Sequence, residues 1–360
     1  MEIIGVQPQR IDFPSQVPMN HPFAPQFERG LGYQPPELRE AYADTRIVVA
    51  GAGGAGQLLA VMAAKKGCLD IVVADPDHVA PSNNRLVFNG PEYIGRNKAV
   101  VTAEEVLAAN AMTRVRVYPE GITSENVEDV LMGGLKKHQR LVVFDGIDVS
   151  RPDAAWDLAK ACRESFVWAQ SLKTPYDIGA TMTTTLDISE GGTVTTYKPN
   201  AHRNTYERLN GIKKGMSPHE LLEQGMDLTH ASYLPKTGSL KTLLAVKNGA
   251  PMPTTEESVL AATALGISEL NRCVLYVRRR NGGTAVKYPK PTFAPRERYF
   301  DARTMSCGTT WTPRLSHRRH LVHAIIRDLF GLNHTTNYSL DEIKEREEFR
   351  DAFAQNNPTS

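Results

Sequence analysis

The feature that most constrains this chain is a short apolar run that ends in a glycine-rich turn. Residues 46–50 read Arg-Ile-Val-Val-Ala, a β-branched run suited to a strand buried on both faces. Residues 51–56 then read Gly-Ala-Gly-Gly-Ala-Gly, and a helical pattern follows from 57 to about 66. Glycines in such a turn permit a tight bend and let a phosphate approach the N-terminus of the next helix. The pattern therefore predicts nucleotide binding by Gly51, Gly53, Gly54 and Gly56.

Strands and helices alternate beyond this turn. Strand-like runs lie at 70–74, 115–118 and 141–144, and helical patterns lie at 97–110, 124–131 and 151–164. Such alternation indicates βαβ units and a parallel sheet. A further strand is expected at 166–170, and 181–187 should pair with 193–197 as antiparallel strands. The sequence thus predicts an α/β protein with a Rossmann-like, doubly wound mixed sheet that is mostly parallel and has antiparallel strands at its C-terminal side.

Composition divides the chain into five segments. Seven prolines before residue 37 forbid a long helix there and favour an extended arm. The polar, weakly periodic stretch at 198–255 is typical of an insertion or lid over a ligand site. We therefore expect an N-terminal arm at 1–45, a nucleotide-binding part at 46–197, the insertion at 198–255, the C-terminal part of the same domain at 256–306 and a helical tail at 307–360.

Charge and cysteine content exclude several classes of protein. The 42 Lys and Arg against 40 Asp and Glu leave a formal charge of +2, so neither nucleic acid nor a membrane surface is an expected partner. No apolar run reaches the roughly 18 residues of a membrane span, and the proline-rich start lacks a signal-peptide layout, which predicts a cytoplasmic protein. The four cysteines form no CxxC pair, so no zinc is expected. Cys307 is expected to be a surface or tail cysteine.

An acidic residue follows the glycine turn at a spacing typical of nucleotide-binding folds. Asp75 comes 19 residues after Gly56, at the end of the second strand, where a carboxylate can accept hydrogen bonds from both ribose hydroxyls. This residue fits NAD, FAD or ATP equally well.

The residues after Asp75 separate these nucleotides. Residues 75–86 read Asp-Pro-Asp-His-Val-Ala-Pro-Ser-Asn-Asn-Arg-Leu, 95–98 read Gly-Arg-Asn-Lys, and 144–148 read Phe-Asp-Gly-Ile-Asp. Together these motifs resemble the ThiF/MoeB/HesA family, whose larger members are the ubiquitin-activating enzymes and which uses this fold for ATP. The resemblance covers about 27–197 and, more weakly, 250–302. Both zinc CxxC pairs of MoeB-type members are absent.

The resemblance implies a role for each residue of the motifs. Asp75 would hold the ribose, and Arg85 would face the phosphates together with Asn83 or Asn84, since the motif is one residue short here. The remaining members are Lys98 on the next helix, Asp145, Asp148 on the Mg²⁺ side, and Arg29, which would reach the ATP of a second copy in a homodimer. Asp77 could assist Mg²⁺ or simply cap its loop.

The activity implied is adenylyl transfer. Attack of a carboxylate on the α-phosphorus of ATP brings two anions together, so the site must spread positive charge around the phosphate. In the family the acceptor is the C-terminus of a ubiquitin-like sulfur carrier or of a short peptide, and the cofactors are ATP and Mg²⁺. Two alternatives remain: an NAD(H)-dependent oxidoreductase, which would leave Arg85, Lys98 and Asp148 without a purpose, and a catalytically silent scaffold of the same family.

Overall fold

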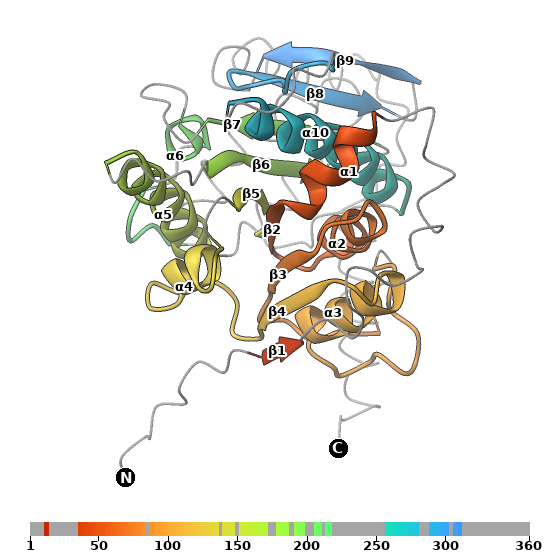
Figure 1. The fold of residues 1–360 in the computed structure, drawn as a ribbon. Coiled ribbons are helices and arrows are strands. Elements are labelled where there is room, and N and C mark those ends of the chain that lie inside the picture. The colour runs from red at the N-terminus through yellow and green to blue at the C-terminus, as the bar shows by residue number, and fades with distance from the viewer. Residues whose placement is uncertain are drawn as a thin grey trace.

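A computed structural model shows one mixed sheet with helices on both faces (Figure 1). The structure describes residues 11–13, 35–81, 83, 86–136, 139–147, 151–171, 178–186, 191–198, 205–210, 213–217, 256–280, 288–301 and 305–311. The sheet has nine strands in the order β1-β4-β3-β2-β5-β6-β7-β8-β9. The expected α/β class with a doubly wound mixed sheet is confirmed.

The parallel half of the sheet is built from the apolar runs of the sequence. It consists of β2 (Thr45–Ala50), β3 (Asp70–Ala74), β4 (Arg114–Tyr118) and β5 (Arg140–Asp145), which pair in parallel with one another and are almost completely buried. A short strand from the proline-rich arm, β1 (Ile11–Phe13), adds to the edge of β4 in the antiparallel direction. Part of the arm therefore lies along the sheet.

Helices cover the two faces of the sheet unequally. One face carries α1 (Pro36–Ala43), α2 (Gly54–Lys65), α3 (Lys98–Ala109) and the long α10 (Glu256–Arg280), and the other carries α4 (Val127–Met132) and α5 (Pro152–Ser171) (Figure 1). Alternate residues of each strand enter two separate cores: Ile47 and Val49 face α2, while Val48 and Ala50 face α4 and α5. This two-sided burial explains why the strands read as continuous apolar runs. No helix among the described residues is long and apolar enough to cross a membrane.

The antiparallel half continues the sheet beyond β5. It contains β6 (Ile178–Leu186), β7 (Gly191–Tyr197), β8 (Arg296–Asp301) and β9 (Ser306–Trp311), with the short helix α6 (Tyr206–Asn210) after β7. The expected pairing of 181–187 with 193–197 is confirmed, because β6 and β7 are antiparallel neighbours. β6 also pairs in parallel with β5, which joins the two halves.

Two local predictions differ from the structure. The run 166–170 is helical rather than extended, because it continues α5, which begins at Pro152 and ends at Ser171. A short apolar run has no periodicity that separates a strand from a helix turn, and here the preceding helix decides. β9 carries the sheet to Trp311, so residues 307–311 of the expected helical tail are extended, and the rest of that tail lies outside the described residues.

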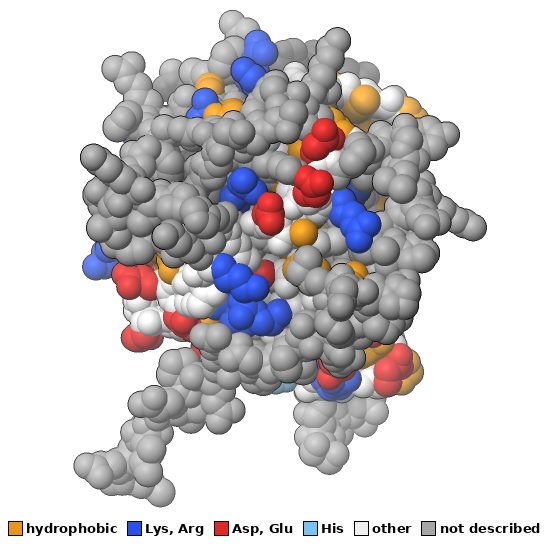
Figure 2. All heavy atoms as spheres, viewed as in Figure 1, with side chains coloured by type: hydrophobic (Ala, Val, Ile, Leu, Met, Phe, Trp, Pro, Cys, Tyr) orange, Lys and Arg blue, Asp and Glu red, His pale blue; other side chains and the backbone are white. Residues whose placement is uncertain are grey.

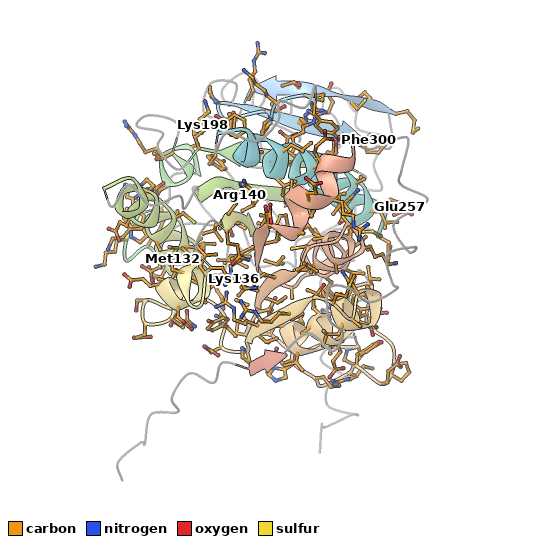
Figure 3. All side chains as sticks on the ribbon, in the orientation of Figure 1. Met132, Lys136, Arg140, Lys198, Glu257 and Phe300 are labelled. Atoms are coloured by element: carbon orange, nitrogen blue, oxygen red, sulfur yellow. The ribbon has the colours of Figure 1, made fainter. Side chains whose placement is uncertain are left out.

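A buried charged cluster holds the amino ends of the parallel strands together. The guanidinium of Arg46 donates to Asp70 Oδ2 from Nε at 2.9 Å and from Nη2 at 2.8 Å, and Arg114 lies 3.2 Å from the same oxygen. Arg46 also donates to the carbonyls of Leu131 and Gly133 at the end of α4. A group of Lys and Arg side chains is visible on the face shown in Figure 2, and Figure 3 places Lys136 beside α4 and the buried Arg140 at β5.

Candidate functional site

The strand order predicts a ligand-binding crevice at the carboxyl ends of β2 and β5. From β2 the chain crosses to β3 and β4 on one side and later returns to β5 on the other, so the order reverses at β2. Ligands of open α/β sheets bind at such a reversal. Ala50 and Asp145, the last residues of β2 and β5, are register partners, and the N–H of Gly146 donates to the carbonyl of Ala50 at 2.7 Å.

The glycine turn lies at this crevice, and its glycines differ in how much space a Cβ would find. Gly51 has φ +93°, and a Cβ there would sit 2.3 Å from the carbonyl oxygen of Gly146. A Cβ on Gly56 would sit 2.0 Å from the carbonyl oxygen of Gly51. A Cβ on Gly53, by contrast, would meet nothing within 4 Å, and Gly53 is the N-cap of α2, which begins at Gly54. The turn is therefore closed against the protein on one side and open at the N-terminus of α2, where a helix attracts phosphate.

Asp75 fixes the other side of the turn. Its carboxylate is buried and accepts the N–H of Ala52 at Oδ2, 2.6 Å away, and the N–H of Asp77 at Oδ1, 2.8 Å away. Burial raises the pKa of Asp75, and the N–H of Asp77, the positive charge of Lys98 and the N–H of Ala52 offset only part of that rise. Each carboxylate oxygen has further lone pairs, so Asp75 can still accept hydrogen bonds from a ligand.

Lys98 stands beside Asp75 at the first residue of α3. Its Nζ lies 3.0 Å from Asp77 Oδ2, and its side chain is only 10% exposed against 61% for Asp77. A lysine held at a helix N-terminus opposes the helix dipole, so an anion at this place relieves that conflict. Asp77 is the anion that Lys98 contacts, and its exposed carboxylate leaves room for a phosphate to take over this role.

Sequence reasoning missed two residues that organise the site. Asn97 caps α3 by accepting the N–H groups of Ala99 and Val100, and its Nδ2 donates to the carbonyls of Asp75 at 2.9 Å and Pro119 at 3.1 Å. An asparagine just before a helical pattern is an N-cap signal that could have identified it. Gln57, fully buried in α2, accepts the N–H of Phe88 and so ties α2 to the loop after β3. No local signal marks this long-range contact.

Only some of the remaining expected site residues are described by the structure. Asp145 is buried at the end of β5 and accepts the N–H of Ile147 at 3.0 Å. Asn83 Oδ1 accepts the N–H of Ala80 at 3.0 Å, so this side chain shapes its own loop. Arg29, Asn84, Arg85 and Asp148 lie outside the described residues. The structure thus brings together the four glycines, Asp75, Asp77, Lys98 and Asp145 around one crevice.

Fold and site together define a Rossmann-like nucleotide-binding protein. Comparison with known families narrows this class, because the model of the ThiF family matches residues 29–224, more than half of the 360 residues. The chain belongs to the ThiF family. The family membership expected from the motifs is confirmed.

Curated relatives match part of the chain. A tRNA threonylcarbamoyladenosine dehydratase of Escherichia coli K12 is 34% identical over 127 residues, 35% of this chain and 45% of the relative. A sulfur carrier protein adenylyltransferase of Thermus thermophilus is 35% identical over 97 residues, 27% of this chain and 36% of the relative. The chain therefore spans less than half the length of these relatives.

Solved structures confirm the fold over a longer stretch. A crystal structure of E. coli MccB with AMPCPP and MccA superposes with a TM-score of 0.51 at 15% identity and covers 82% of this chain and 73% of that one. At this identity the likeness concerns the fold.

Proposed function

We propose that this protein is an adenylyltransferase that uses Mg-ATP to convert a carboxylate into an acyl-adenylate. The observation that carries the proposal is the buried Asp75, held by the N–H groups of Ala52 and Asp77 beside an open glycine turn and next to Lys98. This set offers a ribose acceptor, a phosphate cradle and a cation within one crevice. A dinucleotide also carries a pyrophosphate, so Lys98 serves either ligand, and a hydride-transfer enzyme would need in addition a proton donor beside the nicotinamide.

The chemistry assigns a task to each group. The acceptor carboxylate attacks the α-phosphorus, the bond to the β-phosphate oxygen breaks, and pyrophosphate leaves with its electron pair. Lys98 and Arg85 would stabilise the negative charge that builds up on the phosphates during this step. Asn83 or Asn84 would hold a phosphate oxygen, and Asp145 would fix the chain that leads to Asp148.

Mg²⁺ suits the acidic side chains of this crevice. Mg²⁺ prefers oxygen ligands and is commonly bound by one or two carboxylates together with phosphates. Asp77 presents an exposed carboxylate here, and Asp145 lies at the opposite wall. Asp148, three residues after Asp145, would hold the ion, which screens charge on the phosphates when bound. Asp77 would then give up its ion pair with Lys98 and bind the ion instead.

The acceptor would be the C-terminus of a ubiquitin-like sulfur carrier or of a short peptide, activated in the cytoplasm by a homodimer. The relative named as a sulfur carrier protein adenylyltransferase and the fold likeness to MccB with MccA support this substrate class. In a homodimer, Arg29 of one copy would reach the ATP of the other.

Calorimetric titration tests the nucleotide assignment. We expect Mg-ATP, and not NAD⁺ or NADH, to bind the wild-type protein, and Lys98→Met to weaken ATP binding at least tenfold. Lys65→Met is the matched control, because Lys65 is an exposed lysine at the far end of α2. Binding of NAD(H) alone would overturn the proposal in favour of an oxidoreductase. Binding of ATP without pyrophosphate exchange for any carrier or peptide would favour the silent scaffold.

A further inference from the structure

A buried glutamine in the first turn of α2 has half of its amide group unused. Gln57 directly follows the glycine turn and is fully buried, and its backbone N–H donates to the carbonyl of Gly53 at 2.9 Å. Its side-chain Oε1 accepts the N–H of Phe88 at 3.3 Å, whereas Nε2 is buried without a hydrogen-bond partner among the described residues. An amide nitrogen can donate two hydrogen bonds, and native structures rarely leave a buried polar atom unpaired without a reason.

The stability of the fold does not explain this glutamine. Taking a polar group out of water without a compensating hydrogen bond is unfavourable, and a methionine would fill nearly the same space without a polar nitrogen. The buried residues that follow in α2 are apolar, among them Leu59, Ala60 and Val61. Phe88 is only partly buried, so its N–H can bond to water in place of Gln57. The glutamine therefore points to a use other than stability.

The bond from Gln57 ends on the loop that carries the residues expected at the phosphates. This loop, residues 83–88, begins with Asn83, and Arg85 directly precedes Leu86 in the chain. The N–H of Leu86 donates to the carbonyl of Asn83 at 2.9 Å, and the buried Leu86 packs against Val101 of α3. These contacts fasten the loop to itself and to α3. Gln57 adds a link to α2.

Gln57 thus joins two phosphate-binding elements that are far apart in the sequence. Its backbone belongs to the helix turn that is open for a phosphate, and its side chain holds the loop three residues after Arg85. Helices α2 and α3 pack against each other beside this loop (Figure 1). A shift of the loop along α2 would move Arg85 relative to the phosphates, and a misplacement of about 1 Å is enough to weaken a positioned contact strongly.

We infer that Gln57 is a positioning residue that holds the loop of Asn83 and Arg85 in place beside the glycine turn, so that it serves the phosphates of the nucleotide and not the adenosine. This inference rests on the proposed function and adds a residue to it. Asp75, the expected ribose acceptor, is held by the N–H groups of Ala52 and Asp77 and not by Gln57. Loss of the Gln57 amide should therefore weaken the binding of the phosphates and leave adenosine binding intact.

The test compares adenosine with Mg-ATP in calorimetric titrations of the full chain. The matched control is Gln139, a buried glutamine at the amino ends of the strands, whose Oε1 accepts the N–H of Lys136 at 3.0 Å and whose Nε2 donates to Asp70 Oδ2 at 2.7 Å. We expect Gln57→Met to bind Mg-ATP at least about fivefold more weakly and adenosine within about twofold of the wild type. Gln57→Met should also melt no lower than the wild type. Gln139→Met should bind both ligands as the wild type does and melt at a lower temperature.

Hydrogen exchange of residues 83–89 gives a second readout, which includes the wild-type protein. Exchange in this segment should slow more with saturating Mg-ATP than with saturating adenosine, and Gln57→Met should lose that difference. Equal weakening of both ligands in Gln57→Met, no weakening of either, or a Gln57→Met protein that melts well below the wild type would overturn the inference. Equal exchange of the wild type with the two ligands would also overturn it. A wild-type protein that does not bind Mg-ATP would count against the proposed function instead.

Discussion

Two buried aspartates at the two ends of β3 are held in different ways: one is paired with arginine, and the other is held by backbone N–H groups. Asp70 begins the strand and Asp75 follows its end. Burial alone would raise the pKa of both, but the charge and hydrogen bonds of Arg46, with the charges of Arg114 and Arg116, lower the pKa of Asp70, whereas the pKa of Asp75 stays raised. Asp70 is neutralised by the protein. Asp75 is held by backbone N–H groups and keeps capacity for a ligand.

The difference follows from where the ends of parallel strands point. At the amino ends, the side chains of β2, β3 and β4 meet the carbonyls that end α4, so arginine can satisfy a carboxylate and a helix terminus at once. At the carboxyl ends, helices α2 and α3 begin, and their N–H groups attract anions. One end therefore suits a permanent ion-pair cluster, and the other suits a phosphate.

The largest expected effect comes from breaking the amino-end cluster. Asp70→Asn leaves Arg46 and Arg114 without their counter-charge, and removing one partner of a buried ion pair costs about 3–5 kcal/mol. Asp75→Asn, which removes no arginine partner, should cost only about 1 kcal/mol of stability while weakening ATP binding at least tenfold. Urea unfolding followed by circular dichroism measures the stability loss of each of the two variants. Equal stability losses in the two variants would contradict the contrast.

The glycine turn offers a second comparison within the carboxyl end. In Gly56→Ala the new Cβ would lie 2.0 Å from the carbonyl oxygen of Gly51, so the helix must shift. We expect a loss of roughly 2–4 kcal/mol in the free energy of unfolding. Gly53→Ala meets no atom within 4 Å and should cost less than about 1 kcal/mol, as for alanine at an N-cap. A reversed order of these two variants would show that the turn is not closed by the contacts described above.

Asn97 should have a smaller effect on stability. Asn97→Ala removes the cap of α3 and the donor to the carbonyls of Asp75 and Pro119, which we expect to cost about 1–2 kcal/mol. Thermal unfolding measures the loss. Asn97→Asp keeps the side-chain oxygen that caps α3 but loses the Nδ2 donor, so it separates the two contributions. If Asn97→Asp is as unstable as Asn97→Ala, the whole effect belongs to the donor.

The smallest effects are the pH dependences of the two aspartates, which should have opposite signs. The pKa of Asp70 is lowered on folding, so its contribution to stability is present above its unfolded pKa and is lost as the pH falls through its folded pKa. The pKa of Asp75 is raised, so its contribution is present at low pH and is lost as the pH rises through its folded pKa. Neither slope can exceed about 1.4 kcal/mol per pH unit for one proton.

Unfolding titrations between pH 3 and 6 of the wild type, Asp70→Asn and Asp75→Asn measure these slopes by difference. The wild type should gain stability over Asp70→Asn only as the pH rises toward the unfolded pKa of about 3.9, and should lose stability relative to Asp75→Asn as the pH rises beyond that value. Slopes of the same sign would mean that Asp75 is neutralised within the protein as Asp70 is.

Local patterns predicted most of the fold and the central part of the site. The apolar runs, the glycine turn and Asp75 are short-range signals whose spacing alone places them at the ends of adjacent strands. The strand predicted at 166–170 is wrong because a short apolar run carries no periodicity of its own. Asn97 was missed as a site residue although its position before α3 marks a cap. Gln57 could not be found, because its contact joins segments far apart in the chain.

The sequence by itself determined the alternation of strands and helices, the nucleotide turn and the family, because each depends on residues close together in the chain. Only the tertiary structure decided which buried acids are neutralised and which are left open. Arg46 and Asp70 are 24 residues apart, and Thr195 and Glu297, a buried hydrogen-bonded pair on β7 and β8, are 102 apart, so strand register and not spacing brings them together. The charge state of a buried carboxyl depends on those neighbours and on its desolvation, and both exist only once the sheet has formed.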